Sequence, residues 1–496
     1  SVHMPVHAEN NGITIDGKEG SYETIQSAID DAVDGDTIRI ANGLYKETLV
    51  IKNKAITLSG PNKDIPGTGS RLEEAIITYP DDADPHTVDL LKIIADDVTI
   101  EGLNFEDFTT STNNSAYAEV RLRGSNIRFI NNRVISTADK PAVLFSLTAA
   151  DSRVNPTYGN NVVKGNYISS TTSYSALYLQ AHGAVVEDNN IVGGQYGLQI
   201  QPYANEVGGV IRNNTIGGYT SSIFLNDPYI TSGDWLIDQN DLFSAPISNS
   251  FFSSWLHDDA YHGLSIISLG YAGTNDVVKP HLTFTNNTID GESARLDPDR
   301  QSSAVGIEFI NRIHRDATYT IENNTFKNVD YGARQNAELH DDFVFDAGSF
   351  LDANNFDANY IVDGQNVVLD SFVVEFRNPD GSLIESQNVK PNQSATAPSA
   401  PLVEGKTFVE WNVPFDNVNS NLIVTPIYET NVYTVTFVDY NDKVIDAVDV
   451  EHGSNVTAPS APTRTGFIFP RWDHALENIK NDVTVKPLYQ KEPSVS

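Results

Sequence analysis

Four charged residues stand where an acid–base reaction on a polymer could take place. In alternating apolar and polar runs every second side chain faces away from the core, so Arg121, Arg123 and Glu308 face outward, and Asp227 directly follows another such run. A lyase acting on a uronate needs a base and a cation beside the carboxylate, which indicates Arg121 and Arg123. Inverting hydrolysis needs two carboxyl groups about 6.5–9.5 Å apart, which indicates Asp227 and Glu308.

Planar amides and aromatic rings occupy the same outward positions in neighbouring predicted strands. Amides donate to and accept from hydroxyl groups, and ring faces suit the C–H face of a sugar. Because stacked strands lie about 4.8 Å apart, these side chains form a stripe that fits an extended, weakly charged glycan. The alternative is that outward strand positions are polar because they meet water. The predicted binding residues are Tyr178, Gln180, Gln199, Gln201, Tyr203, Phe224, Asn226, Tyr229, Asn311 and Arg312.

The densest set of possible metal ligands lies in a long segment between two repeats. Asp258 and Asp259 stand there between His257 and His262, and their carboxylate oxygens suit calcium. Because no further ligand converges on them, a solvated loop is the alternative. The sequence therefore indicates no cofactor with certainty, and calcium bound by Asp258 and Asp259 is the one alternative that stays open.

The composition excludes several classes of function. The chain of 496 residues has no cysteine and a net charge of −34, so neither a disulfide nor a thiolate metal site is expected. The negative charge should repel nucleic acid and anionic bilayers, although it could also serve only solubility. No apolar run is long enough to insert into a membrane. The expected partner is a polysaccharide or a host or cell-surface glycan, and the expected state is a monomer.

A repeated polar pair divides the first three quarters of the chain into coils. Each pair follows an alternating apolar run, and the second positions recur at intervals of 24 to 47 residues. Such self-similarity is typical of a solenoid in which each repeat is one coil. Asparagines stacked at each corner could exchange amide hydrogen bonds along the solenoid. The pairs are Asn131-Asn132, Gly165-Asn166, Asn189-Asn190, Asn213-Asn214, Gln239-Asn240, Asn286-Asn287, Asn323-Asn324 and Asn354-Asn355.

Strands and one helix must position these side chains. Residues Thr24 to Val33 place Ile25, Ala28, Ile29 and Val33 on one helical face, and this helix is expected to cap the open end of the solenoid. The later coils each begin with an alternating strand. These predicted strands are Val120–Arg123, Ala142–Leu147, Ala176–Gln180, Gly197–Gln201, Ser222–Asn226, Leu264–Ser268 and Gly306–Ile310.

Together, the segment from Thr24 to Leu58 and the strand order of the coils resemble the right-handed parallel β-helix of the pectate-lyase superfamily. The resemblance covers residues 12–370 and implies an all-β solenoid with an N-terminal capping helix. It does not select an activity, because this fold hosts lyases, hydrolases, epimerases, esterases and adhesins. The acid clusters and paired-aspartate motifs of its lyases and polygalacturonases are missing from the predicted wall.

Two related segments follow the solenoid. Phe372–Phe376 matches Tyr433–Phe437, and the motif Thr-Ala-Pro-Ser-Ala-Pro recurs 61 residues later. This pattern resembles the Listeria–Bacteroides repeat, which implies two small β-grasp-like modules at residues 371–430 and 431–490. Trp411 and Trp472 occupy the same position in the two repeats, where we expect core anchors rather than sugar platforms.

Three functions remain open from the sequence. The first is a secreted or cell-wall-associated bacterial adhesin-like protein that binds an extended carbohydrate along the solenoid wall. The second is a polysaccharide lyase or glycoside hydrolase that uses the same groove. The third is a surface spacer without a ligand. In each case we expect an extracellular location.

Overall fold

The computed structural model divides the chain into two units, Ser1–Asp370 and Ser371–Ser496. It describes residues 12–109, 117–138, 140–145, 159–170, 175–180, 183–201, 208–225, 234–245, 265–269, 281–292, 303–309, 318–335 and 344–495. No helix in these ranges is long and apolar enough to cross a lipid bilayer.

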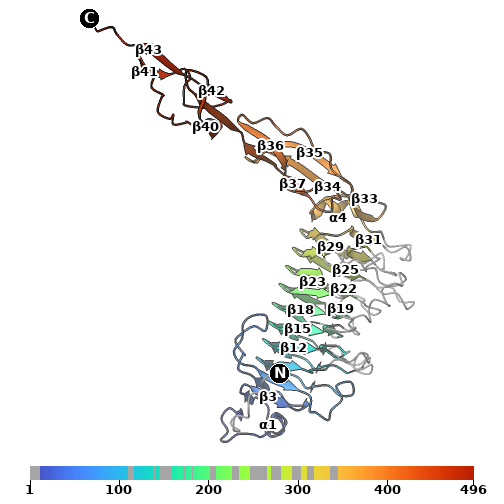
Figure 1. Cartoon of the computed structure of the whole chain (residues 1–496). Helices are drawn as coiled ribbons and strands as arrows, with labels where there is room; N and C mark the ends of the chain where they lie inside the picture. Colours follow the sequence, from blue (N-terminus) through green and yellow to red (C-terminus); the bar gives the residue numbers. More distant parts are fainter. Residues whose placement is uncertain are drawn as a thin grey trace. The chain divides into compact units, whose positions relative to one another are not determined.

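The first unit is a right-handed parallel β-helix in which successive coils add one strand to each of three sheets (Figure 1). Sheet A contains β1 (Ile13–Ile15), β2 (Thr37–Ile40), β5 (Thr57–Ser59), β8 (Thr99–Glu101), β11 (Arg128–Ile130), β14 (Val162–Lys164), β17 (Val185–Glu187), β20 (Gly209–Arg212), β23 (Asp234–Asp238), β26 (His281–Thr285) and β29 (Thr318–Glu322). Sheet B contains β3 (Gly43–Lys46), β6 (Ala75–Thr78), β9 (Asn104–Glu106), β12 (Arg133–Ser136), β15 (Tyr167–Ser170), β18 (Asn190–Gly193), β21 (Thr215–Gly218), β24 (Asp241–Ser244), β27 (Thr288–Asp290), β30 (Thr325–Lys327) and β32 (Asn355–Phe356).

Sheet C forms the third wall. Its parallel strands are closed at one end by β34, which pairs antiparallel with β31. The strands are β4 (Leu49–Lys52), β7 (Leu91–Ile94), β10 (Val120–Arg123), β13 (Val143–Phe145), β16 (Leu177–Leu179), β19 (Tyr196–Ile200), β22 (Ser221–Leu225), β25 (Ser265–Leu269), β28 (Val305–Phe309), β31 (Tyr331–Gln335), β33 (Asn359–Asp363) and β34 (Asn366–Arg377). The predicted first strands of the coils are these strands, displaced by at most a few residues at their ends.

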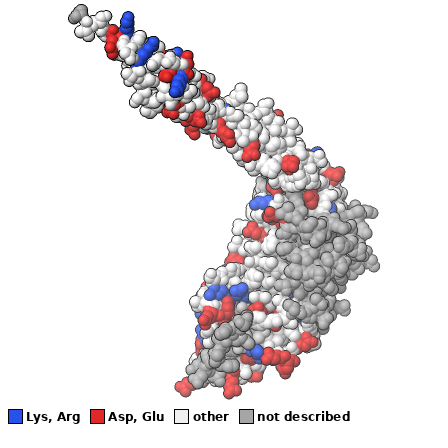
Figure 2. Space-filling view, viewed as in Figure 1, with Lys and Arg blue, Asp and Glu red and all other residues white. Residues whose placement is uncertain are grey.

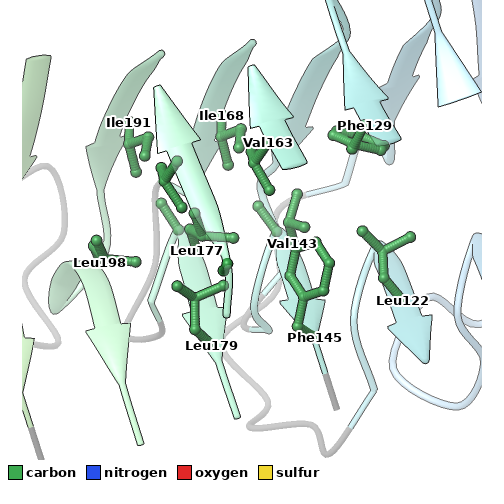
Figure 3. Close-up of a cluster of buried hydrophobic side chains, with 14 of the residues drawn as sticks. Leu122, Phe129, Val143, Phe145, Val163, Ile168, Leu177, Leu179, Ile191 and Leu198 are labelled. Atoms are coloured by element: carbon green, nitrogen blue, oxygen red, sulfur yellow. The ribbon is translucent and has the colours of Figure 1, made fainter. Parts of the chain in front are cut away.

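The core of the β-helix is a continuous stack of aliphatic and aromatic side chains. Side chains from the three sheets point toward one another inside each coil, as Figure 3 shows for Val163 of sheet A, Ile168 of sheet B and Val143 of sheet C. Adjacent coils repeat this arrangement because parallel strands pair in register, for example Leu177 with Leu198. Burial of these rows supplies most of the driving force for folding.

A buried asparagine ladder runs along the corner between sheets A and B. From Asn166 onward, each ladder Oδ1 accepts the backbone N–H of the preceding rung, at 2.8 Å for Asn132 N to Asn166 Oδ1. From Asn189 onward, each ladder Oδ1 also accepts the side-chain Nδ2 of the preceding rung, at 3.0 Å for Asn214 Nδ2 to Asn240 Oδ1. The Nδ2 group additionally donates to a backbone carbonyl, such as Val186 for Asn214, at 2.9 Å. The predicted amide ladder is therefore confirmed. Its rungs are Asn132, Asn166, Asn189, Asn214, Asn240, Asn287, Asn324 and Asn354.

Two rungs differ by one residue from the predicted second positions, which were Asn190 and Asn355. The residue before a rung turns the chain with a positive φ, and Asp188 fills that position at 59°, which leaves Asn189 as the rung. Aspartate and asparagine tolerate this backbone conformation better than most residues. At the other position, helix α4 (Ala347–Ala353) ends immediately before Asn354, which is its C-cap.

The capping helix is shorter than predicted. Helix α1 (Ile25–Asp31) begins at Thr24, whose side chain accepts from the Ser27 backbone N–H in a capping box. Ile25, Ala28 and Ile29 are buried as expected. Val33 is instead 61% exposed, because the helix ends at Asp31 and the next residue, Ala32, is already extended.

The second unit contains two modules with the same strand pairing. In each, a long strand pairs antiparallel with the next strand and parallel with a short one, and the two strands on either side of the short one in the chain pair antiparallel with each other. Trp411 packs edge-on against Phe376 and Trp472 against Phe437, with ring centroids 5.1 and 5.3 Å apart; both tryptophans are core anchors. The strands are β34, β35 (Leu383–Val389), β36 (Lys406–Trp411), β37 (Leu422–Val424) and β38 (Pro426–Thr430), then β39 (Val432–Val438), β40 (Val444–Glu451), β41 (Phe467–Trp472), β42 (Val483–Val485) and β43 (Pro487–Lys491).

Substitution of a ladder residue should destabilise the β-helix. Asn214→Ala removes the acceptor of the Asn189 backbone N–H and side-chain Nδ2, and it removes the side-chain donor to the Val186 carbonyl, so we expect the free energy of unfolding to fall by about 2–4 kcal/mol. The measurement is chemical denaturation followed by circular dichroism. The matched control is Asn213→Gly at the adjacent exposed corner, where glycine accepts the positive φ of 54°. Equal losses for the two variants would contradict the ladder's role.

Candidate functional site

Two neighbouring strands of sheet C bring polar predicted binding residues together. Tyr178 of β16 pairs in register with Gln199 of β19, and these side chains face away from the core because Leu177, Leu179 and Leu198 fill it. The Tyr178 hydroxyl donates to Gln201 Oε1. Gln199 Nε2 lies 3.5 Å from the same oxygen. We call Tyr178, Gln180, Gln199 and Gln201, which are all half-buried, the amide patch.

A serine outside the predicted set supports the amide patch. Ser175 Oγ donates to Gln199 Oε1 at 2.6 Å, so the Gln199 side-chain carbonyl is held and its amide nitrogen turns toward Gln201. Ser175 precedes the strand, and only the stacking of coils places it beside Gln199. The patch is thus a set of oriented amides rather than a row of independent solvated side chains.

An aromatic pair lies on the next strand, and it corrects the expected exposure of Phe224. Phe224 of β22 pairs in register with Gln199, yet it is only 4% exposed. Its ring stacks on Tyr196, with centroids 4.5 Å apart and an interplanar angle of 21°. Burial raises the pKa of the Tyr196 hydroxyl, so that group stays a neutral hydrogen-bonding group. Phe224 therefore supports the outer wall and presents little of its own surface.

An ion pair lies at one side of the patch along the stack. Arg121 Nε donates to Asp89 Oδ2 at 2.7 Å, and Asp89 Oδ1 also accepts the Ala118 backbone N–H at 2.8 Å. Arg121 is therefore held by a buried carboxylate that the sequence pattern did not indicate, since Asp89 lies before β7. Arg123 occupies the next outward position of β10 and is half-buried.

A second ion pair lies at the other side, and it corrects the expected exposure of Glu308. Glu308 of β28 is 3% exposed and meets Arg334 of β31, Nη2 to Oε1, at 2.8 Å. Among the described residues nothing hydrogen-bonds to its other oxygen. Burial raises the pKa of Glu308, and the Arg334 guanidinium only partly opposes this shift. A carboxyl group with a raised pKa is suited to donate a proton.

Eight predicted site residues lie outside the described part of the chain: Asp227, Tyr203, Asn226, Tyr229, Asn311, Arg312, Asp258 and Asp259. Their roles, including the Asp227–Glu308 separation, remain predictions. Within the described ranges no three His, Cys, Asp or Glu side chains form a group that could hold a metal ion.

The connections between strands set this wall apart from the other two. From β8 onward, the corner between sheets A and B is always two residues long, as at residues 131–132. The long connections instead lead into or out of sheet C, for example between β13 and β14 and between β24 and β25. Segments of variable length beside a regular wall are where binding functions concentrate. The amide patch lies on that wall.

Comparison with known proteins identifies the second unit. The Listeria-Bacteroides repeat domain family matches residues 372–421 and 433–487, which are the two modules with identical strand pairing. The resemblance of these segments to that repeat is therefore confirmed.

Two curated relatives come from Evansella cellulosilytica. One, provisionally named a Gly-rich membrane protein, is 25% identical over 134 residues, which cover 23% of this chain and 16% of the relative. The other, provisionally named a membrane protein, is 27% identical over 111 residues, which cover 20% of this chain and 17% of the relative. The matched part thus spans about a sixth of each relative's length.

Two solved structures align with most of the chain. A pectin methylesterase in complex with a hexasaccharide is 14% identical, with a TM-score of 0.28 and coverage of 67% of this chain and 91% of that one. A family 28 exopolygalacturonase from Yersinia enterocolitica is 13% identical, with a TM-score of 0.27 and coverage of 68% and 75%.

The raised pKa of Glu308 predicts a pH dependence of stability. The folded state favours the protonated Glu308 carboxyl. The stabilisation of the folded protein by this group is therefore fully present below the ordinary glutamate pKa of about 4.3, and it is lost as the pH rises through the raised pKa of the folded state. Relative to Glu308→Gln, the wild type should therefore lose stability as the pH rises through this window. Chemical denaturation at several pH values measures the difference. The matched control is Glu322→Gln at an exposed site, and a constant difference between wild type and Glu308→Gln would contradict the prediction.

Proposed function

We propose that the first unit binds an extended, weakly charged polysaccharide along sheet C, and that the protein is an adhesin-like protein of the bacterial cell surface. The observation that carries this proposal is the amide patch, in which Tyr178, Gln199 and Gln201 are oriented by hydrogen bonds on adjacent strands. Oriented amides can donate to and accept from sugar hydroxyls with little loss of side-chain entropy.

The charge distribution supports a weakly charged ligand. The amide patch consists of tyrosine and glutamine side chains and carries no charge, and the ion pairs on its two sides, Arg121–Asp89 and Glu308–Arg334, are each internally compensated. Elsewhere, Figure 2 shows acidic side chains scattered over the face in view rather than gathered at one site. With a net charge of −34, the protein should repel a polyanionic glycan.

The second unit supports a location at the cell surface. Its tandem modules each have their own small core, as in the cluster of Val435, Phe437, Ile479 and Val485, and such repeats can extend a binding domain. The relatives' names assign them to a membrane. A secreted or cell-wall-associated binding protein accords with both observations.

Substitutions in the amide patch should weaken polysaccharide binding without unfolding the protein. We expect Tyr178→Ala and Gln201→Ala each to raise the dissociation constant about tenfold or more, because each removes a ring face or an amide worth about 1.4 kcal/mol. The measurement is retention on a glycan array, followed by titration of the best ligand. Tyr167→Ala on sheet B is the matched control. Unchanged binding of both patch variants to every retained glycan would refute the site.

A polysaccharide-degrading enzyme is the second candidate, and the buried Glu308 with its raised pKa favours it. A hydrolase would use Glu308 as the acid with Asp227 as the predicted partner, and a lyase would use Arg121 or Arg123. Incubation with a polysaccharide panel, with and without calcium, should then release reducing ends or unsaturated products. In a hydrolase, Glu308→Gln should lower the turnover by about a hundredfold or more. Retention without any product would exclude this candidate for the panel.

A further inference from the structure

A fully buried lysine and a fully buried glutamate face each other near the N-terminal end of the β-helix. Lys140, between β12 and β13, and Glu119, directly before β10, are both 0% exposed. Lys140 Nζ lies 3.5 Å from Glu119 Oε1. By the alternation of β10, in which Val120 and Leu122 point inward, Glu119 lies on the outward side of the strand; it is nevertheless covered, with Lys140 of the connection between β12 and β13 beside it. This pair takes no part in the amide patch.

The surroundings of Lys140 suit a neutral amine. Its Nζ donates to the Tyr79 hydroxyl and, at 2.6 Å, to the Pro85 carbonyl, and it lies 4.4 Å from the centre of the Tyr79 ring. A neutral amine has two N–H bonds, and these two oxygens accept both. The lone pair is then left for the third neighbour, Glu119. Burial lowers the pKa of Lys140, although the nearby carboxylates oppose this shift.

The surroundings of Glu119 suit a protonated acid. Burial raises its pKa, and a hydrogen bond to Asp107 raises it further. Ser136 Oγ approaches Oε1 at 3.4 Å, but no N–H or O–H group among the described residues donates to the buried Oε2. Two carboxyl groups can hydrogen-bond only when they share a proton. Glu119 holds that proton.

Asp107 is the partner that stays ionised. Burial by itself would raise the pKa of Asp107, but hydrogen bonds from Glu119, from Thr137 and from backbone N–H groups lower it. The backbone donors are Thr137 at 3.0 Å, Ala138 at 2.8 Å and Thr109 at 3.2 Å. Asp107 therefore acts as a fixed carboxylate beside the acid, and it can carry a proton from one group to another.

We propose that Lys140 and Glu119 form an intramolecular amide bond, with Asp107 as the proton carrier. The lone pair of Nζ attacks Cδ of Glu119, so the Nζ–Cδ bond forms and the Cδ–Oε2 bond breaks. Asp107 accepts one amine proton and delivers it to Oε2, which leaves as water with the carboxyl proton. The reaction needs no oxidant or co-reactant. Exclusion of solvent from the site favours the condensed product over hydrolysis.

Such a bond would join the connection before β10 to the connection before β13, and so tie neighbouring coils of the β-helix covalently. The amide keeps one N–H, which lies beside the Tyr79 hydroxyl and the Pro85 carbonyl on the connection between β6 and β7 and can donate to one of them. The tie would resist unravelling of the coils nearest the capping helix.

Mass spectrometry of the full-length protein tests the proposal. We expect the intact mass to be lower than the sequence mass by one water, and a tryptic digest to contain a branched peptide that joins residues 93–121 to residues 134–153. Lys164 and Glu187, which lie 3.3 Å apart with the lysine exposed to solvent, should remain in unlinked peptides. The full sequence mass in folded protein, or a water loss that maps to another site, would overturn the proposal.

Two variants separate the roles of the residues. Lys140→Met removes the nucleophile and fills its volume, and Asp107→Asn leaves both reacting groups in place; each should show the full sequence mass and no branched peptide. Circular dichroism and resistance to protease identify the folded variants, so that loss of the link is read only in folded protein. A link that persists in folded Asp107→Asn would overturn the role of Asp107, and one that persists in Lys140→Met would overturn the whole assignment.

Discussion

The asparagine ladder is the constraint on which the rest of the β-helix depends. A parallel solenoid can stack only if successive corners have the same geometry, and a two-residue corner must both reverse the chain and satisfy its buried amides. The residue with positive φ turns the chain, as Asn131 does at 53°, and the asparagine after it bonds to its neighbours along the stack. Because this corner cannot lengthen without loss of its ladder bonds, the chain varies where it enters and leaves sheet C.

This restriction explains why the candidate site lies on sheet C. The wall combines a rigid base with long connections at its edges, and its outward column joins residues far apart in the sequence, such as Arg121, Gln199 and Glu308. The column is more deeply buried than a solvated sheet face would be. In that setting the charged members are paired, with Asp89 and Arg334 as partners, because an unpaired charge is costly away from water. The amide patch, which lies between these ion pairs, is uncharged and polar, and this suits the hydroxyl groups of a ligand.

The same cost shapes the N-terminal coils, where Lys140, Glu119 and Asp107 are buried together. Transfer of an ammonium and a carboxylate out of water is opposed by desolvation. Transfer of a proton from the ammonium to the carboxylate leaves a neutral amine and a neutral acid, and this relieves part of the cost. The neutral forms are also the reactive forms for amide formation. A network that stabilises the stack through hydrogen bonds is thus placed to become a covalent one. The second unit needs no such device, since each module is built around its own tryptophan.

The sequence by itself determined the solenoid, the position of its corners to within one residue and the inward or outward direction of most strand side chains, because these follow from short-range periodicity. Asn132 and Asn214 could be predicted as rungs for that reason, as could the outward direction of Tyr178. Only the tertiary structure decided which outward residues are covered and which side chains they contact. Phe224 stacks on Tyr196, Glu308 lies against Arg334, and Glu119 lies against Lys140. Alternation gives the side of a sheet on which a residue lies, whereas its burial and its partner depend on the register between coils and on connections whose lengths follow no period.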